Sequence, residues 1–216
     1  MDVLFQCLLR PVLLLVKQQA ERFIALLVGI ALLGACAVAP PVAPLANTPW
    51  AARQAALNAL RQWSAVGRIA VVNDQDGWHA SLSWVQQGPD YAIELLGPFG
   101  QGRVSIQGNP QGVSLQTADG RFLSAADPDQ LLQDTIGVRI PVSGLMYWVR
   151  GVPDPAQPSE LAGDEQGRLT RLEQGGWVID YPAYGQVAAL ELPTRIQAQR
   201  DQIKVKLVIE QWNLQP

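Results

Sequence analysis

The chain has 216 residues, 48% of them apolar, and a formal net charge of −3. This length and composition are sufficient for one folded domain with a sizeable hydrophobic core. The 16 basic residues are outnumbered by 19 acidic ones and are scattered along the sequence, which argues against a nucleic-acid partner.

The N-terminal residues have the pattern of a bacterial export signal. Lys17 and Arg22 precede the uncharged run FIALLVGIALLGAC, which ends in small residues before Cys36. The sequence Leu33-Gly34-Ala35-Cys36 resembles the lipobox of bacterial lipoproteins. This resemblance implies that residues 1–35 are a lipoprotein signal peptide and that Cys36, acylated on its sulfur, begins the mature chain.

An alternative interpretation of this segment is a transmembrane helix. Residues 23–39 carry no charge and approach the length that spans a bilayer. Pro40, Pro41 and the position of Cys36 favour the lipoprotein interpretation. In the sorting rule of Gram-negative lipoproteins, an Asp after the modified Cys favours the inner membrane, so Ala37 indicates the outer membrane. The protein is then lipid-anchored on the periplasmic face.

A tether and a single domain are expected to follow the signal peptide. Residues 36–49 contain the acylated Cys and the run AVAPPVAPLANTP, which favours polyproline II and predicts a tether. Residues 50–216 are expected to form one domain. It opens with a helix that carries Trp50 and Leu57 on one side.

From about residue 66 the hydrophobic pattern has a period of two. Trp78, Ala80, Leu82 and Trp84 alternate with polar or small residues, which predicts a half-buried antiparallel strand. Strands are expected near residues 66–71, 78–84, 91–95, 103–107, 112–117, 121–124, 168–174, 177–181, 194–200 and 203–210. Two short helices are expected over 127–137 and 143–151.

This order of elements predicts a mainly β protein of the α+β class. About ten strands would form one strongly curved, antiparallel sheet, and about three helices would cover its concave face. Seven tryptophans are many for such a chain, and several fall on inward faces of the expected strands. They either form an ordinary packed core or line an incompletely filled barrel that binds an apolar ligand.

The patterns that carry chemistry are weak. His79 is the sole histidine and lies opposite the Trp face, so it is interpreted as a solvent-facing strand residue. The glycines at 97, 100 and 102 reverse the dinucleotide-binding order, and no lysine follows them. The acidic segment 154–167 fits no standard calcium loop and is interpreted as a solvated loop. These residues predict no catalytic, cofactor or metal site.

Several segments together resemble the LolB-type outer-membrane lipoprotein receptors of the lipoprotein localisation system. They are the lipobox, the Pro-rich tether, SLSWVQQGPDYAIELLGPFGQ, PVSGLMYWVRGVP, GGWVIDY and KVKLVIEQW. The similarity runs from about Trp50 to Trp212. It implies an unclosed β-barrel with a helical lid, a hydrophobic cavity between them, and no enzymatic activity.

The resemblance also implies partners and a site. Such a protein accepts acylated lipoproteins from a periplasmic carrier of LolA type and places them in the inner leaflet of the outer membrane, and we expect it to act as a monomer. The aromatic residues expected around the cavity are Trp84, Trp148, Trp177 and Trp212. Two rival functions remain at this point: an envelope-assembly scaffold whose tryptophans form only a core, and a lipid-modifying hydrolase that uses His79.

The stretch ELLGPFGQGRV places Phe99 among turn residues. Gly97, Pro98 and Gly100 are expected to hold its side chain at a loop tip, clear of the sheet. LolB-type proteins more often have Leu at this place, and Phe is also apolar and is larger. We therefore expect Phe99 to enter the membrane; the alternative is a tip that folds back onto the barrel rim.

Overall fold

The computed structural model describes residues 48–73, 76–100, 102–131 and 142–214. All the described residues belong to one compact unit of the chain, Val42–Pro216. The expected signal peptide, Cys36 and nearly all of the tether therefore lie outside the described residues. None of the helices in the described ranges is long and apolar enough to cross a bilayer.

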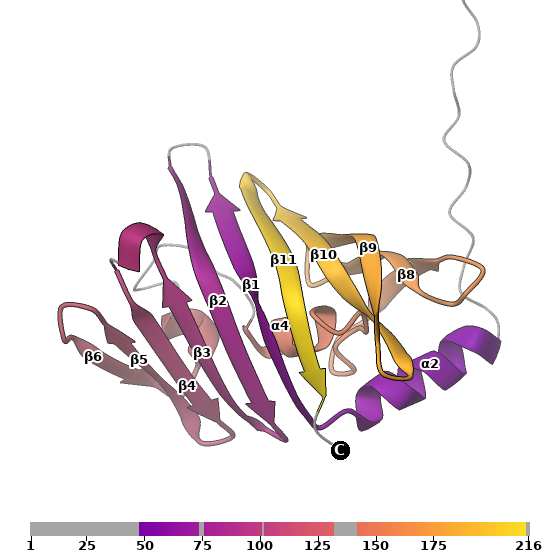
Figure 1. Ribbon diagram of the computed structural model, residues 1–216, viewed down its shortest axis with the longest axis horizontal. Coiled ribbons are helices and arrows are strands. Elements are labelled where there is room, and N and C mark those ends of the chain that lie inside the picture. The colour runs from indigo at the N-terminus through magenta and orange to yellow at the C-terminus, as the bar shows by residue number, and fades with distance from the viewer. Residues whose placement is uncertain (1–47, 74–75, 101, 132–141, 215–216) are drawn as a thin grey trace, which may run out of the picture. The chain divides into compact units, whose positions relative to one another are not determined.

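Within these ranges, one antiparallel sheet contains eleven strands (Figure 1). The strands are β1 (Gln62–Val72), β2 (Gly77–Gln87), β3 (Asp90–Leu96), β4 (Val104–Asn109), β5 (Gly112–Thr117), β6 (Phe122–Ala125), β7 (Ser159–Gly163), β8 (Leu169–Gln174), β9 (Trp177–Val187), β10 (Leu190–Arg200) and β11 (Ile203–Leu214). Their order in the sheet is β6-β5-β4-β3-β2-β1-β11-β10-β9-β8-β7. The first and last strands of the chain are thus neighbours at its centre, while β6 and β7 form its two edges.

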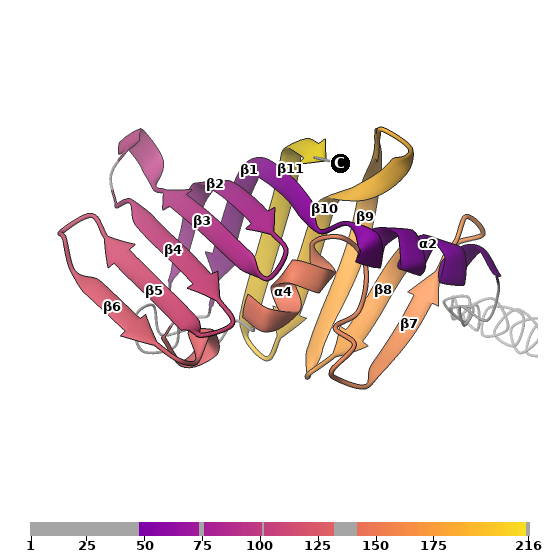
Figure 2. The same ribbon diagram turned by 90° about the horizontal axis from the view of Figure 1, so that it is seen from below.

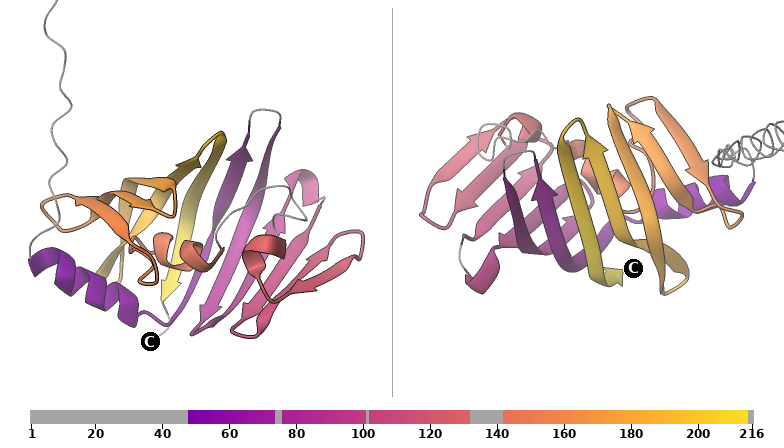
Figure 3. Two further views of the ribbon diagram at one scale, coloured as in Figure 1. Left: turned by 180° about the vertical axis from the view of Figure 1, so that it is seen from behind. Right: turned by 90° about the horizontal axis from the view of Figure 1, so that it is seen from above.

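Three helical elements have full bounds in the structure: α2 (Thr48–Ala59), the 3-10 helix η1 (Pro98–Gly100) and α4 (Val142–Trp148). Seen from below, the sheet curls around α4 (Figure 2). The view from behind shows α4 on the concave side and α2 along one end of the sheet (Figure 3). The predicted fold class, a mainly β, unclosed and curved antiparallel barrel with helices, is confirmed.

Helix signals in the sequence match the structure at two places. A helical turn occupies residues 128–131, and the Asp127 Oδ1 atom caps it by accepting a hydrogen bond from the Asp129 N–H at 2.9 Å. After α4, Gly151 has a positive φ of 77°, a conformation that glycine adopts readily and that ends helices. Residues 132–141 of the first expected helix lie outside the described residues.

The expected strands are present, and β7 is one more than the sequence pattern predicts. It lies in segment 154–167, whose interpretation as a solvated loop is wrong for Ser159–Gly163. The sequence pattern missed this strand because β7 is a short edge strand that pairs only with β8 in the described sheet. Ala162 is its one buried residue, so no apolar alternation marks the strand in the sequence.

The core fills the concave side of the sheet and reaches under α2. Trp50 and Leu57, the stripe predicted for the first helix, are both buried there. Arg150 ties α2 to α4: its Nη1 atom donates to the Leu57 carbonyl at 2.8 Å and its Nε atom donates to the Met146 carbonyl at 2.9 Å. Burial lowers the pKa of Arg150, and these carbonyls at helix C-termini stabilise its charge.

Candidate functional site

An apolar cavity of about 90 Å³ lies between the concave face of the sheet and α4. All fifteen of its lining residues are aliphatic or tryptophan. They are Ile69, Trp78, Leu82, Trp84, Ile93, Leu95, Ile106, Leu145, Trp148, Val149, Ile179, Ile196, Ala198, Val205 and Leu207. A cavity with this lining suits a hydrocarbon ligand and offers an ion nothing to bind.

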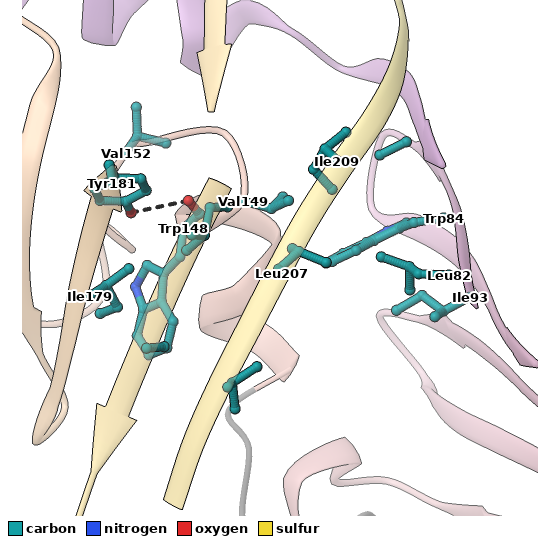
Figure 4. Close-up of a cluster of buried hydrophobic side chains, with 14 of the residues drawn as sticks. Leu82, Trp84, Ile93, Trp148, Val149, Val152, Ile179, Tyr181, Leu207 and Ile209 are labelled. Atoms are coloured by element: carbon teal, nitrogen blue, oxygen red, sulfur yellow. Dashed lines mark hydrogen bonds between the residues drawn. The ribbon is translucent and has the colours of Figure 1, made fainter. Parts of the chain in front are cut away.

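Strand alternation explains how distant parts of the chain supply this lining. Side chains in a strand alternate between faces, so β2 directs Leu82 and Trp84 inward while Ser83 between them faces solvent. Helix α4 closes the opposite side with Trp148. Figure 4 shows Trp84 and Trp148 on opposite sides of Leu207, which comes from the centre of the sheet.

Two hydrogen bonds fix Trp148 at the cavity. Its Nε1 atom donates to Gln174 Oε1 at 2.8 Å. Its backbone carbonyl accepts from the Tyr181 hydroxyl at 3.0 Å, the bond drawn in Figure 4. Burial raises the pKa of Tyr181 well above its ordinary value, so this hydroxyl keeps its proton. The indole therefore presents its ring, and not its N–H group, to the cavity.

Gln174 is itself buried and fully hydrogen-bonded. Besides the indole, its Oε1 atom accepts from the Asp154 N–H at 2.8 Å. Its Nε2 atom donates to the carbonyls of Asp154, at 2.9 Å, and Gln157, at 3.0 Å. Gln174 thus joins the end of β8 to the loop after α4 and holds Trp148 against both.

Trp84 is held in a similar way by a second buried glutamine. Its Nε1 atom donates to Gln86 Oε1 at 3.1 Å, and Gln86 Nε2 donates to the carbonyls of Gly88 and Asp90. Sequence reasoning missed Gln86 and Gln174. The available signal was a polar residue at an inward position, because Gln86 follows Ala80, Leu82 and Trp84 in the same alternation.

The structure brings two of the four expected cavity tryptophans, Trp84 and Trp148, to the lining. Trp177 packs beside Trp148 with ring centroids 6.2 Å apart and is not among the lining residues. Trp212 packs against Trp63 at 5.4 Å and donates from Nε1 to the Pro193 carbonyl. An acyl-binding role for all four stays a prediction.

The loop expected to contact the membrane forms η1. Pro98 and Gly100 are exposed, and Gly100 has a positive φ of 77°. The side chain of Phe99 lies outside the described part of the structure, as does Cys36, so both roles stay predictions. His79 is exposed on the face of β2 opposite Trp84. No cluster of three or more potential metal-binding side chains occurs in the described ranges.

The fold of this protein is shared with a known structural class. The structure is similar to a crystal structure of a LolA superfamily protein from Nitrosomonas europaea, with a TM-score of 0.51 and 8% sequence identity over 79% of this chain and 95% of that one. At this identity the likeness concerns the fold alone. The protein therefore has the fold of the LolA superfamily.

Sequence comparison identifies the family within that class. Residues 61–212 match the family described as outer membrane lipoprotein LolB. The chain is 35% identical to the LolB of Nitrosococcus oceani, covering 89% of this chain and 98% of that protein, and 38% identical to the LolB of Alkalilimnicola ehrlichii, covering 88% and 97%. This chain belongs to the LolB family, and is thus an outer-membrane lipoprotein of the Lol system.

Proposed function

We propose that this protein accepts acylated lipoproteins from a periplasmic carrier of LolA type and inserts them into the outer membrane. The observation that carries the proposal is the wholly apolar lining of the cavity beneath α4. A lipoprotein's acyl chain is the part that water excludes, and such a lining replaces water around it. In this account the protein binds and transfers, and it performs no covalent chemistry.

The energetics favour direct transfer between two cavities. Exposing an acyl chain to water costs about 0.8 kcal/mol per methylene group, hence on the order of 10 kcal/mol for a chain of ordinary length. Release into water is therefore prohibitive, and the two cavity mouths must meet. A tenfold preference for the receptor over the carrier needs only about 1.4 kcal/mol, so rising affinity is sufficient to give direction.

The cavity must widen to hold such a ligand. A cavity of about 150 Å³ is matched to benzene, whereas this one is about 90 Å³. Two hydrogen bonds hold the C-terminal end of α4 at Trp148. Leu145, one turn earlier, is only partly buried. We infer that the helix moves away from the sheet at Leu145 and pivots at Trp148.

Anchor and loop complete the proposal. Residues 1–35 are a signal peptide. The acylated Cys36 and the tether to residue 49 hold the protein on the periplasmic face. Residues 50–216 act as a monomeric receptor domain. The exposed glycine- and proline-framed loop at η1 supports insertion of Phe99. Burying a Phe is worth roughly 1.5 to 3 kcal/mol, which gives a reversible contact.

A fluorescent fatty-acid probe tests the cavity directly. Leu145→Glu places a carboxylate in the lining, and we expect it to weaken probe binding at least tenfold, because desolvating a charge costs several kcal/mol. Met146→Glu is the matched control: Met146 is the next residue of α4, is also partly buried and does not line the cavity. Equal binding by the wild type and both variants would disprove the proposed site.

A further inference from the structure

A second hollow, of about 600 Å³, lies on the outer face of the sheet, behind the cavity. The outward-facing residues Arg68, His79 and Lys206, from β1, β2 and β11, are among those that line it, and η1 forms one of its sides with Pro98 and Gly100. In β2, strand alternation directs Leu82 and Trp84 to the cavity and His79 to this hollow, while Ile69 of β1 lines both. The loop expected at the membrane and this outer face therefore adjoin.

The outer face beside η1 is basic. Arg68 and Lys206 line the hollow. Lys204 lies two residues along β11 from Lys206. On β10, Gln197 pairs with Lys206, so Arg195, two residues before Gln197, is a diagonal neighbour of Lys206. Diagonal neighbours in a sheet lie about 7–8 Å apart, so these cations share one surface. We call Arg68, Arg195, Lys204 and Lys206 the basic outer face.

Few carboxylates compensate this charge. Arg68 pairs with Glu210 at 2.7 Å, and both side chains stay largely exposed, at 69% and 50%. Arg195, Lys204 and Lys206 are exposed and form no ion pair with another described residue. The other carboxylates on this face near these cations are Glu94 on β3 and Asp180 on β9, which lies opposite Gln197 and pairs with Arg171 at 3.3 Å.

Four cations and three carboxylates leave a local charge of +1. The complete chain has a net charge of −3, so this surface departs from the rest of the protein. Lysines without an ion-pair partner among the described residues lie on this sheet face beside an exposed loop. Their positive charge is complementary to the negative charge of a surface of phosphate groups.

We propose that the basic outer face docks on anionic phospholipid headgroups, so that η1 and these cations contact the membrane together. The inference rests on the proposed function, because it says how the receptor meets the membrane into which it delivers. Stable membrane contact usually takes two signals, one apolar and one electrostatic. Each basic side chain near an anionic surface strengthens binding by roughly fivefold.

Vesicle binding tests this proposal. The protein would carry Cys36→Ala and a cleavable signal in place of residues 1–35, so that no acyl anchor contributes. It would be mixed with vesicles of phosphatidylcholine alone or with about one third phosphatidylglycerol, a composition chosen to supply phosphate charge. We expect at least tenfold tighter binding to the anionic vesicles at low salt, and loss of this preference at about 0.5 M salt, where the Debye length is short.

A charge-matched pair of variants locates the effect. The double change Lys204→Gln, Lys206→Gln should abolish the preference for anionic vesicles. A control that removes the same charge elsewhere should retain it; its changes are Arg61→Gln and Arg121→Gln, both at exposed positions.

Three outcomes would overturn the proposal. The first is equal binding of the wild type to both vesicle types. The second is a basic-face variant that keeps the wild-type preference for anionic vesicles. The third is a basic-face variant that binds vesicles normally but no longer takes cargo from a LolA-type carrier. The last would assign the surface to a protein partner. Failure of the proposed function itself would appear separately, as absent cargo uptake by the wild type.

Discussion

Gln174→Leu is the change that most sharply tests how the cavity helix is held. In the wild type, Gln174 satisfies the Trp148 indole N–H, the Asp154 N–H and carbonyl, and the Gln157 carbonyl. Leucine has similar size but can make none of these bonds. Gln157 is exposed and its carbonyl can bind water, whereas Trp148 and Asp154 are only 2% and 6% exposed.

The expected loss of stability follows from the groups left unpaired. Two N–H groups would remain buried without partners, each at a cost of about 1–3 kcal/mol, whereas the Asp154 carbonyl keeps the Gln157 N–H as a donor at 3.4 Å. Leucine adds some apolar burial, so we take the lower end and expect the free energy of unfolding to fall by about 2 kcal/mol. The variant should also bind the fatty-acid probe differently, because Trp148 would no longer be held at the lining.

Urea unfolding followed by circular dichroism measures this loss. Gln116→Leu, at an exposed position of β5, is the control and should change stability by less than about 0.5 kcal/mol. If Gln174→Leu is as stable as that control, the hydrogen bonds of Gln174 do not hold the helix and the reasoning fails.

Three further predictions concern the loop, the anchor and the sheet. Phe99→Glu should leave the melting temperature and cargo uptake nearly unchanged but block delivery into liposomes, and Phe99→Leu should retain most delivery; unfolding of Phe99→Glu, or its normal delivery, would contradict membrane insertion. Mass spectrometry should find a mature chain that starts at Cys36 and is heavier than residues 36–216 by acyl and glyceryl groups; an intact Met1 would contradict this. Burial opposes ionisation of Asp164, but hydrogen bonds from Arg168 outweigh it and lower the Asp164 pKa below 3.8. Its contribution to stability is therefore present above pH 3.8 and lost as pH falls through the folded-state pKa. Asp164→Asn should be destabilised at pH 7 and converge with the wild type in acid; an equal loss at pH 7 and pH 2 would contradict it.

Local patterns predicted most of the sheet because alternation is recorded in adjacent residues. The inward positions Leu82 and Trp84 of β2 follow directly from it. The same reasoning fails for β7, which has one buried residue and pairs with one neighbour in the described sheet. An edge strand of this kind gains its conformation from β8 rather than from its own side chains.

A β-bulge explains how Trp212 comes to face inward. The pairing of β1 with β11 shifts between Val66 and Gly67: Gln211 faces Val66 and Ile209 faces Gly67, so Glu210 is the extra residue. The inward set of β11 thereby changes from odd to even positions, and Trp212 packs against Trp63 beyond the bulge. A sequence pattern does not reveal such a shift, because it depends on the partner strand.

The polar support of the cavity was also beyond local reasoning. Gln174 contacts Trp148 across 26 residues of sequence and Asp154 across 20. The curl of the sheet brings these segments together. The sequence indicated inward-facing tryptophans, but which of them border an empty space depends on that curl and on the position of α4.

Transfer of a labelled, acylated lipoprotein from a LolA-type carrier tests the central claim most directly. Without detergent, the label should move from the carrier to the wild-type protein and then into liposomes. Leu145→Glu should block the first step, while Met146→Glu should allow it. If no label reaches the wild-type protein, or if Leu145→Glu accepts it as fast as Met146→Glu, the apolar cavity is not the site that receives the acyl chains.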